Sequence, residues 1–200
     1  WGDNFTAERK LMVFFVQALS RELELMPFFK GGFEMTRMGL IGCGKMGRNF
    51  AKSLHHLSDR MTFTAMVDID ERKAKKAAEL WPDVRVAKNY KNVMDDIDAA
   101  IVTVPHYLHH KVALHLLDAG KDVMVEKPLA LTERDCVDLV EASRSSESVL
   151  MVGYVMRFNP LWHKMGEFLR EKAFGEPFHI SIWTEQYTND TRPWIGDLKM

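Results

Sequence analysis

The sequence contains few cysteines, no long apolar run and no excess of either charge. Only two of its 200 residues are cysteines, Cys43 and Cys136, and their spacing matches no paired-thiol motif. This favours a reducing compartment, so we expect a cytoplasmic protein. The 27 basic residues nearly balance the 28 acidic ones, which leaves no electrostatic footprint for nucleic acid. No apolar stretch approaches the ~18 residues needed to cross a bilayer, so no membrane partner is expected.

Residues 1–34 are predicted to form an N-terminal amphipathic helical extension. Six apolar residues recur at helical spacing, namely Met12, Phe15, Val16, Leu19, Leu23 and Met26. Lys10, Gln17, Arg21 and Glu24 take the opposite face. The apolar core after Arg9 and Lys10 leaves a signal peptide as an alternative, which the polar face disfavours. The helix would dock on the body of the protein or on a partner chain.

From residue 37 onward, short apolar runs alternate with helical stretches. Strand-like runs cover 37–42, 61–68, 98–104, 122–126 and 148–155. Helical patterns cover 45–57, 71–81, 106–120 and 131–145, with Thr132 as an expected N-cap and Gly120 at a C-terminal end. This alternation predicts an α/β fold, with a parallel sheet and crossover helices.

A glycine loop follows the first strand and opens the first helix of this pattern. Gly42, Gly44 and Gly47 fit G-x-G-x-x-G, with Lys45 and Met46 between the last two, and Asp68 ends the next strand. Gly42 permits the tight turn, Gly44 lets the backbone approach a pyrophosphate, and Gly47 lets the helix pack on the strand. The N–H groups at the helix start would meet the phosphates. A Rossmann-type dinucleotide site is predicted, and a purely structural glycine turn is the alternative.

The acidic strand end favours NAD over NADP. The Asp68 carboxylate would accept hydrogen bonds from a ribose diol and repel a 2′-phosphate. Ile69 and Asp70 supply no cation beside it, although Arg72 could turn toward a phosphate and keeps NADP as an alternative. Cys43 is either a thiol with a pKa lowered by the helix N-terminus or a small residue that fills a crowded turn.

Several motifs together resemble the glucose–fructose oxidoreductase / inositol dehydrogenase (Gfo/Idh/MocA) family. They are GLIGCGKMG, VDID, TVPHYLHHKVALHLLDAGKDVMVEKPLALT and GYVMRFNP, in family order from about Met38 to Pro160. The resemblance implies a Rossmann domain at 35–153 and, at 154–200, the truncated start of an α+β substrate domain. It also implies an NAD(P)-dependent oxidoreductase that acts on a sugar-like substrate and forms a homo-oligomer at full length.

The resemblance also assigns roles to individual residues. Lys127 of Glu126-Lys127-Pro128 would be the active-site lysine that bonds the reacting hydroxyl, and a cis bond would precede Pro128. Independently, Lys127 follows a strand and so lies at the carboxyl edge of the sheet, where such folds bind ligands. Further cofactor contacts are expected at Thr103, Pro105, His109 and Glu126.

Two further groups of residues leave their roles open. Tyr154 and Arg157 would lie near the substrate or serve as hinge packing, and Trp183–Trp194 reads as the first strand and loop of the substrate sheet. His106, His109, His110 and His115 suggest a metal site, but no cysteine or HExxH pattern joins them, so no metal is predicted.

The family's downstream Asp and His pair does not occur before Met200. We therefore expect the acid/base residue beyond this segment, and we expect residues 1–34 to be foreign to the family domain. The predicted reaction moves hydride between nicotinamide and a secondary alcohol of a sugar, inositol or nucleotide-sugar. Two other functions are a non-catalytic dinucleotide-binding sensor or assembly module, and a methyltransferase, which also uses a glycine loop and an acidic strand end.

Overall fold

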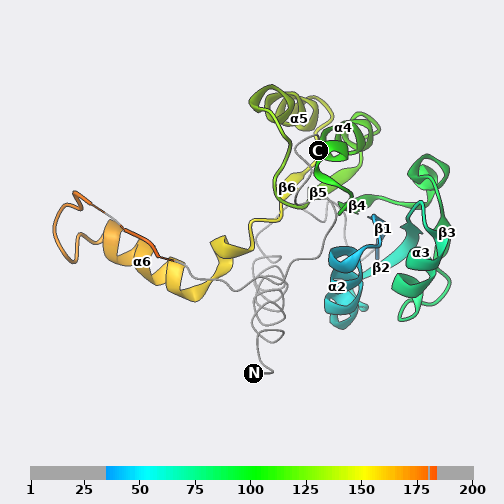
Figure 1. The fold of residues 1–200 in the computed structure, drawn as a ribbon, viewed down its shortest axis with the longest axis horizontal. Coiled ribbons are helices and arrows are strands. Elements are labelled where there is room, and N and C mark those ends of the chain that lie inside the picture. Colours follow the sequence, from blue (N-terminus) through cyan, green and yellow to red (C-terminus); the bar gives the residue numbers. More distant parts are fainter. Residues whose placement is uncertain (1–34, 180, 184–200) are drawn as a thin grey trace. The chain divides into compact units, whose positions relative to one another are not determined.

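A computed structural model describes residues 35–179 and 181–183 (Figure 1). The predicted helix at 1–34 and all of Trp183–Trp194 except Trp183 lie outside the described residues. The chain divides into two compact units, one ending at Val155 and the other beginning at Met156.

The first unit is built on one parallel sheet, as the alternating pattern predicted. Its strands are β1 (Thr36–Ile41), β2 (Met61–Val67), β3 (Arg85–Ala87), β4 (Ala99–Val102), β5 (Asp122–Val125) and β6 (Leu150–Val152). They lie side by side in the order β3-β2-β1-β4-β5-β6. The sequence analysis missed β3, because three residues at a sheet edge are too few to show a period.

Crossover helices cover both faces of the sheet, which makes the fold doubly wound. They are α2 (Lys45–Ser53), α3 (Glu71–Ala78), α4 (His109–Asp118) and α5 (Glu133–Ser145), with 3₁₀ turns η1 (Leu54–Leu57), η2 (Tyr90–Asp96) and η3 (His106–Leu108). The helices α2 and α3 lie on one side and α4 and α5 on the other (Figure 1). The strand order reverses between β1 and β4, and right-handed crossovers in opposite directions place the two helix pairs on opposite faces.

Local sequence signals set the helix ends. The Thr132 hydroxyl accepts the N–H of Asp135 at 3.1 Å, so its predicted role as N-cap of α5 is confirmed. Gly120 adopts φ 70° just after α4. There the N–H groups of Gly120 and Lys121 donate to the carbonyls of Leu117 at 2.8 Å and Leu116 at 3.0 Å. This pair of bonds satisfies the last carbonyls of the helix and turns the chain into β5.

Apolar side chains fill both sides of the sheet. On the α2 side, Phe63 meets the Trp81 ring edge-on with centroids 4.9 Å apart, and Trp81 donates its indole N–H to the Ala51 carbonyl at 2.9 Å. On the other side, a second cluster contains the fully buried leucines of α4 and α5, which are Leu116, Leu117 and Leu139. Burial of each such side chain stabilises the fold by about 1.5–3 kcal/mol.

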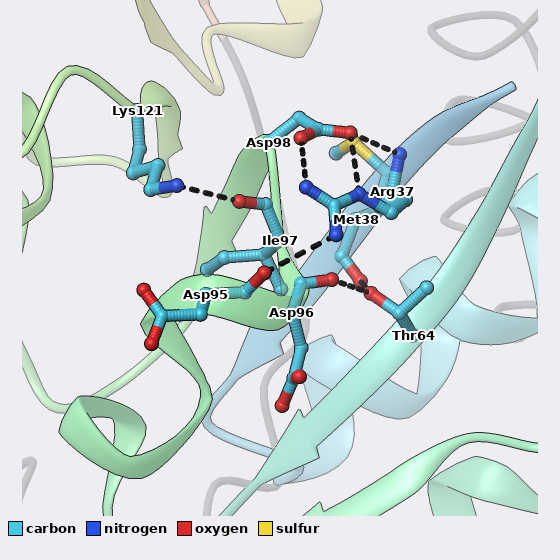
Figure 2. Close-up of polar contacts among 8 residues, drawn as sticks. All are labelled: Arg37, Met38, Thr64, Asp95, Asp96, Ile97, Asp98 and Lys121. Atoms are coloured by element: carbon cyan, nitrogen blue, oxygen red, sulfur yellow. Dashed lines mark hydrogen bonds and ion pairs between the residues drawn. The ribbon is translucent and has the colours of Figure 1, made fainter. Parts of the chain in front are cut away.

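A polar cluster joins the amino-terminal end of β1 to the start of β4 (Figure 2). Arg37 donates to both carboxylate oxygens of Asp98, through Nη2 at 2.6 Å and Nε at 3.1 Å, and through Nη1 to the Asp95 carbonyl at 3.2 Å. The Thr64 hydroxyl donates to the Asp96 carbonyl at 2.6 Å, and Lys121 Nζ donates to the Ile97 carbonyl at 2.8 Å. These bonds satisfy carbonyls of the segment that carries the chain into β4.

In the second unit, η4 (Val155–Phe158) crosses the division and α6 (Pro160–Arg170) follows. The Asn159 side chain accepts the Leu161 N–H at 2.9 Å, and Pro160 occupies the first helical turn, so both residues act as start signals for α6. Among the described residues of both units, no helix has the length and apolar character needed to span a bilayer.

The Arg37–Asp98 pair predicts a pH-dependent stability. The hydrogen bond from Arg37 holds the pKa of Asp98 below its ordinary value of 3.8. The lowered pKa means that the pair stabilises the fold above that value and stops doing so as pH falls through the folded-state pKa. Arg37→Met should therefore lower the unfolding free energy by roughly 1 kcal/mol at pH 7, the upper end for an exposed pair.

Urea unfolding at pH 7 and pH 3 measures this effect. The deficit of Arg37→Met should shrink at pH 3, and Arg144→Met, at an exposed arginine of α5, is the control. An equal deficit at both pH values would contradict an ionic contribution from Asp98.

Candidate functional site

The predicted site segments all follow strands, and they meet at the carboxyl edge of the sheet. The glycine loop follows β1, Asp68 follows β2, Thr103 follows β4, Glu126 follows β5 and Gly153 follows β6. The strand order reverses between β1 and β4, and open α/β sheets bind ligands at such a switch point. The parallel register therefore gathers residues that are far apart in the sequence.

Steric contacts explain two of the three loop glycines. Gly42 has φ +95°, and a Cβ there would lie 2.7 Å from the Thr103 carbonyl. A Cβ on Gly47 would lie 2.0 Å from the Gly42 carbonyl oxygen and 2.9 Å from the Thr103 hydroxyl oxygen. Side chains at these two positions would force the start of α2 away from β1 and β4.

Gly44 differs, because a Cβ there would meet nothing within 4 Å. Gly44 is the N-cap of α2, no side chain caps that helix, and its first turn has no acidic residue. The first N–H groups of α2 have no acceptor within the helix and lie at its positive end. Exposed Lys45 and Met46 follow in the same turn. This arrangement fits the pyrophosphate of a dinucleotide.

Asp68 is held in place by the backbone on both sides. Its Oδ2 accepts the Cys43 N–H at 2.9 Å, and its Oδ1 accepts the Asp70 N–H at 2.9 Å. The first bond ties the acidic strand end directly to the glycine loop. Each oxygen keeps a second lone pair, so the carboxylate can still accept hydrogen bonds from a ribose.

Cys43 is fully buried in the loop, and its Sγ donates to the Val67 carbonyl at 3.5 Å. Burial, followed by the nearby Asp68 charge, raises the pKa of the Cys43 thiol to about 12. The thiol therefore stays protonated at neutral pH, and the prediction of a small residue filling a crowded turn is confirmed.

Arg72, the residue that left NADP as an alternative cofactor, forms an ion pair with Asp70. Its Nε and Nη2 donate to the two Asp70 oxygens at 3.1 and 3.2 Å. These hydrogen bonds lower the pKa of Asp70 and raise that of Arg72. The guanidinium is highly exposed, so this ion pair contributes little to stability. In the structure, Arg72 is bonded to Asp70 and is not directed toward Asp68 as a phosphate ligand.

His109 connects the turn after β4 to the turn after β5. The ring is fully buried, with Nδ1 2.7 Å from the Pro128 carbonyl oxygen and Nε2 3.0 Å from the Val104 carbonyl oxygen. Both ring nitrogens thus face backbone acceptors, and a neutral imidazole can donate to only one of them. His109 therefore contacts the backbone of the two turns that carry predicted site residues. Its contacts with the Val104 and Pro128 carbonyls were not predicted from the sequence.

The Glu126-Lys127-Pro128 turn places a lysine on the surface and a carboxyl group beneath it. The Lys127–Pro128 bond is cis, as expected, and Lys127 is exposed. Glu126 is buried, and its Oε2 accepts the Lys127 N–H at 3.0 Å. A Cβ on Gly153 would lie 3.2 Å from Glu126 Oε1, so this glycine leaves room for the carboxyl group.

The remaining predicted residues are Thr103, Pro105, Tyr154 and Arg157. Thr103 donates its hydroxyl to the Gly42 carbonyl, and Pro105 directly precedes η3. Tyr154 is exposed after β6 in the first unit, whereas Arg157 is exposed in the second unit. The predicted site residues of the first unit thus lie at or just after the carboxyl ends of its strands.

The comparisons identify the family. A family model described as "Oxidoreductase family, NAD-binding Rossmann fold" matches residues 36–154. The chain belongs to this family, the Gfo/Idh/MocA oxidoreductases. The match removes support from the methyltransferase alternative, and NAD is the cofactor of the family's Rossmann domain.

Inositol dehydrogenases are among the similar Gfo/Idh/MocA proteins. Inositol 2-dehydrogenase from Acidothermus cellulolyticus is 33% identical over 71% of this chain and 42% of its own length. Inositol 2-dehydrogenase 2 from Saccharopolyspora erythraea is 34% identical over 69% of this chain and 42% of its own length. The chain therefore spans less than half of the curated relatives it matches.

Solved Gfo/Idh/MocA structures share the fold. The WlbA dehydrogenase from Chromobacterium violaceum, in complex with NADH and UDP-GlcNAcA, has a TM-score of 0.68 at 28% identity. That match covers 75% of this chain and 43% of the other. GenD2 from gentamicin A biosynthesis, in complex with NAD, has a TM-score of 0.65 at 25% identity, covering 74% and 42%.

Two glycine variants should separate folding from cofactor binding. Gly47→Ala places a methyl group against the Gly42 carbonyl and should cost about 1–3 kcal/mol of stability, as overpacking does. Gly44→Ala meets no protein atom, so it should leave stability nearly unchanged and lower NAD affinity. Thermal melts with and without NAD measure both effects. Equal NAD affinity in Gly44→Ala and the parent would contradict a phosphate site at this loop.

Glu126 predicts a second pH effect, opposite in sign to that of Asp98. Burial raises the pKa of the Glu126 carboxyl, and the Lys127 N–H only partly opposes the shift. The folded state therefore holds this proton more tightly, and stability is lost as pH rises through the folded-state pKa. Glu126→Gln should raise the melting temperature at pH 8 and lose that advantage below the ordinary value of 4.5. A pH-independent change would contradict this origin.

Proposed function

We propose that this domain is the cofactor-binding part of an oxidoreductase that transfers hydride between NAD and a secondary alcohol. The substrate would be a sugar, an inositol or a nucleotide-sugar. One observation carries the proposal: Lys127 stands exposed at the carboxyl end of β5, and the glycine loop and Asp68 lie at the same sheet edge. Inositol and nucleotide-sugar dehydrogenases among the relatives support this substrate class.

The residues at this edge of the sheet would have separate roles in cofactor binding and in catalysis. The glycine loop would hold the pyrophosphate and Asp68 the adenosine ribose, so that the nicotinamide half extends toward β4 and β5. The Lys127 ammonium would donate a hydrogen bond to the reacting oxygen and stabilise negative charge there as the proton leaves. Bound NAD supplies the hydride acceptor. Tyr154 would contribute to the substrate side.

The base that removes the hydroxyl proton is proposed to lie outside the described residues. His109 is a poor candidate, because both ring nitrogens face backbone carbonyls in a fully buried position. The curated relatives extend well beyond the matched region, which covers only 42% of their length. Arg157, in the second unit, is proposed to approach the substrate.

We further propose a preference for NAD over NADP. Asp68→Ser removes the ribose acceptor and the charge that repels a 2′-phosphate. NAD affinity should fall roughly 10- to 100-fold, the worth of a hydrogen bond to a charged group, while NADP affinity stays level or rises. Isothermal titration with NAD, NADP, NADH and NADPH measures the ratio. Asp70→Asn is the control, because Asn keeps the helix cap and leaves Asp68 intact, so its NAD affinity should match the parent.

Hydride transfer is tested in the full-length protein by NADH formation from myo-inositol and UDP-sugars. Lys127→Met should lower kcat by about 100-fold or more while NAD affinity changes little, because the lysine acts on charge that develops during the reaction. Lys111→Met, at an exposed lysine of α4, is the matched control. If both variants turn over like the parent, Lys127 has no catalytic role. NAD binding by the full-length protein without turnover of any of these alcohols would favour the dinucleotide-binding sensor.

A further inference from the structure

A histidine and two aspartates that the cofactor site does not use lie together between α4 and α5. His110 Nδ1 is 3.8 Å from Asp135 Oδ1, and His110 Nε2 is 3.6 Å from Asp138 Oδ2. One nitrogen or oxygen ligand atom from each residue lies within 4.8 Å of the other two. His110 comes from the first turn of α4, and both aspartates come from the first half of α5.

His110 Nε2 has no hydrogen-bond partner among the described residues, although the atom is buried from solvent. Buried polar atoms in native proteins nearly always have a partner, which can be an ion that a structure does not include. The nitrogen points toward the Asp138 carboxylate, but 3.6 Å is too long for a hydrogen bond. An ion between the two groups would satisfy both of them.

We propose that His110, Asp135 and Asp138 bind one divalent transition-metal ion of the zinc class. One imidazole and two carboxylates form a ligand set that suits zinc, whereas magnesium and calcium prefer oxygen ligands alone. The two carboxylates would balance the charge of the ion. One ion would use a single ring nitrogen of His110. Metal bonds of about 2.1 Å hold tetrahedral ligand atoms about 3.4 Å apart, so ligand atoms that lie within 4.8 Å of one another would have to approach by about 1.4 Å at most.

Other features keep the three ligands available. The backbone N–H of Asp135 is capped by the Thr132 hydroxyl, so the Asp135 carboxylate is not the helix cap. The three side chains are 27%, 32% and 41% exposed, which lets the ion enter and a water molecule complete the coordination. The ligands come from two helices that β5 separates in the sequence, so no short sequence motif predicts this metal site.

The bound ion would join α4 to α5 on one face of the sheet. A ligand that binds only the folded state raises its stability, so zinc should raise the melting temperature of this chain. This role is structural and independent of hydride transfer, since none of the three ligands belongs to the glycine loop or the Lys127 turn. NAD affinity should therefore be the same with and without zinc.

The test is titration of the full 200-residue chain with Zn²⁺ by calorimetry, and with Co²⁺ by visible absorption. One ion per chain is expected at the site. His110→Gln and Asp138→Asn should each weaken binding by at least about tenfold, since losing a ligand should cost no less than losing an outer-shell partner. His56→Gln and Glu141→Gln, at an exposed histidine and an exposed acid of α5, should bind like the parent.

Melts without metal show whether each variant folds, and NAD titration reports the cofactor site separately. The proposal is overturned if the parent binds no Zn²⁺ saturably. It is also overturned if the folded His110→Gln variant binds Zn²⁺ as tightly as the parent, or if the control variants lose as much affinity as the ligand variants.

Discussion

The close approach of three backbone segments is the constraint on which the site depends. The start of α2 passes so near the Gly42 carbonyl and Thr103 that Gly47 has no room for a methyl group. This contact fixes the first helix against β1 and β4 at the switch point of the sheet. The N-terminal end of α2 therefore lies at the carboxyl edge of the sheet, and a Cβ on its N-cap residue Gly44 would meet nothing within 4 Å.

Hydrogen bonds between side chains and the backbone fix the neighbouring turns against this loop. Asp68 receives N–H groups from Cys43 and Asp70, so the acidic strand end and the glycine loop form one piece. On the other side, His109 bridges the carbonyls of Val104 and Pro128 and so sets the turn that presents Lys127. The positions of Asp68 and of the Lys127 turn are thus set by hydrogen bonds to neighbouring backbone segments.

The sequence predicted the parallel sheet and the glycine geometry, because both follow from local patterns. Alternating apolar runs and helices define the crossovers, and only glycine tolerates the contacts at Gly42 and Gly47. Cys43 is fully buried, as expected of a small residue that fills a crowded turn. Arg157 lies in the second unit, so the structure leaves its predicted substrate contact as a proposal. The bridge made by His109 and the cluster around His110 could not be predicted, since their partners come from distant segments and show no sequence period.

The two halves of the candidate cofactor site meet at the hydrogen bond from Thr103 to the Gly42 carbonyl. One half contains the loop and Asp68, and the other contains the turns joined by His109. A molecule that occupies both halves loses its translational freedom once, so the second half binds at a high effective concentration. Two separate mononucleotides gain no such advantage, even if they make the same contacts. The rigid junction therefore favours ligands in which two nucleotides are covalently linked.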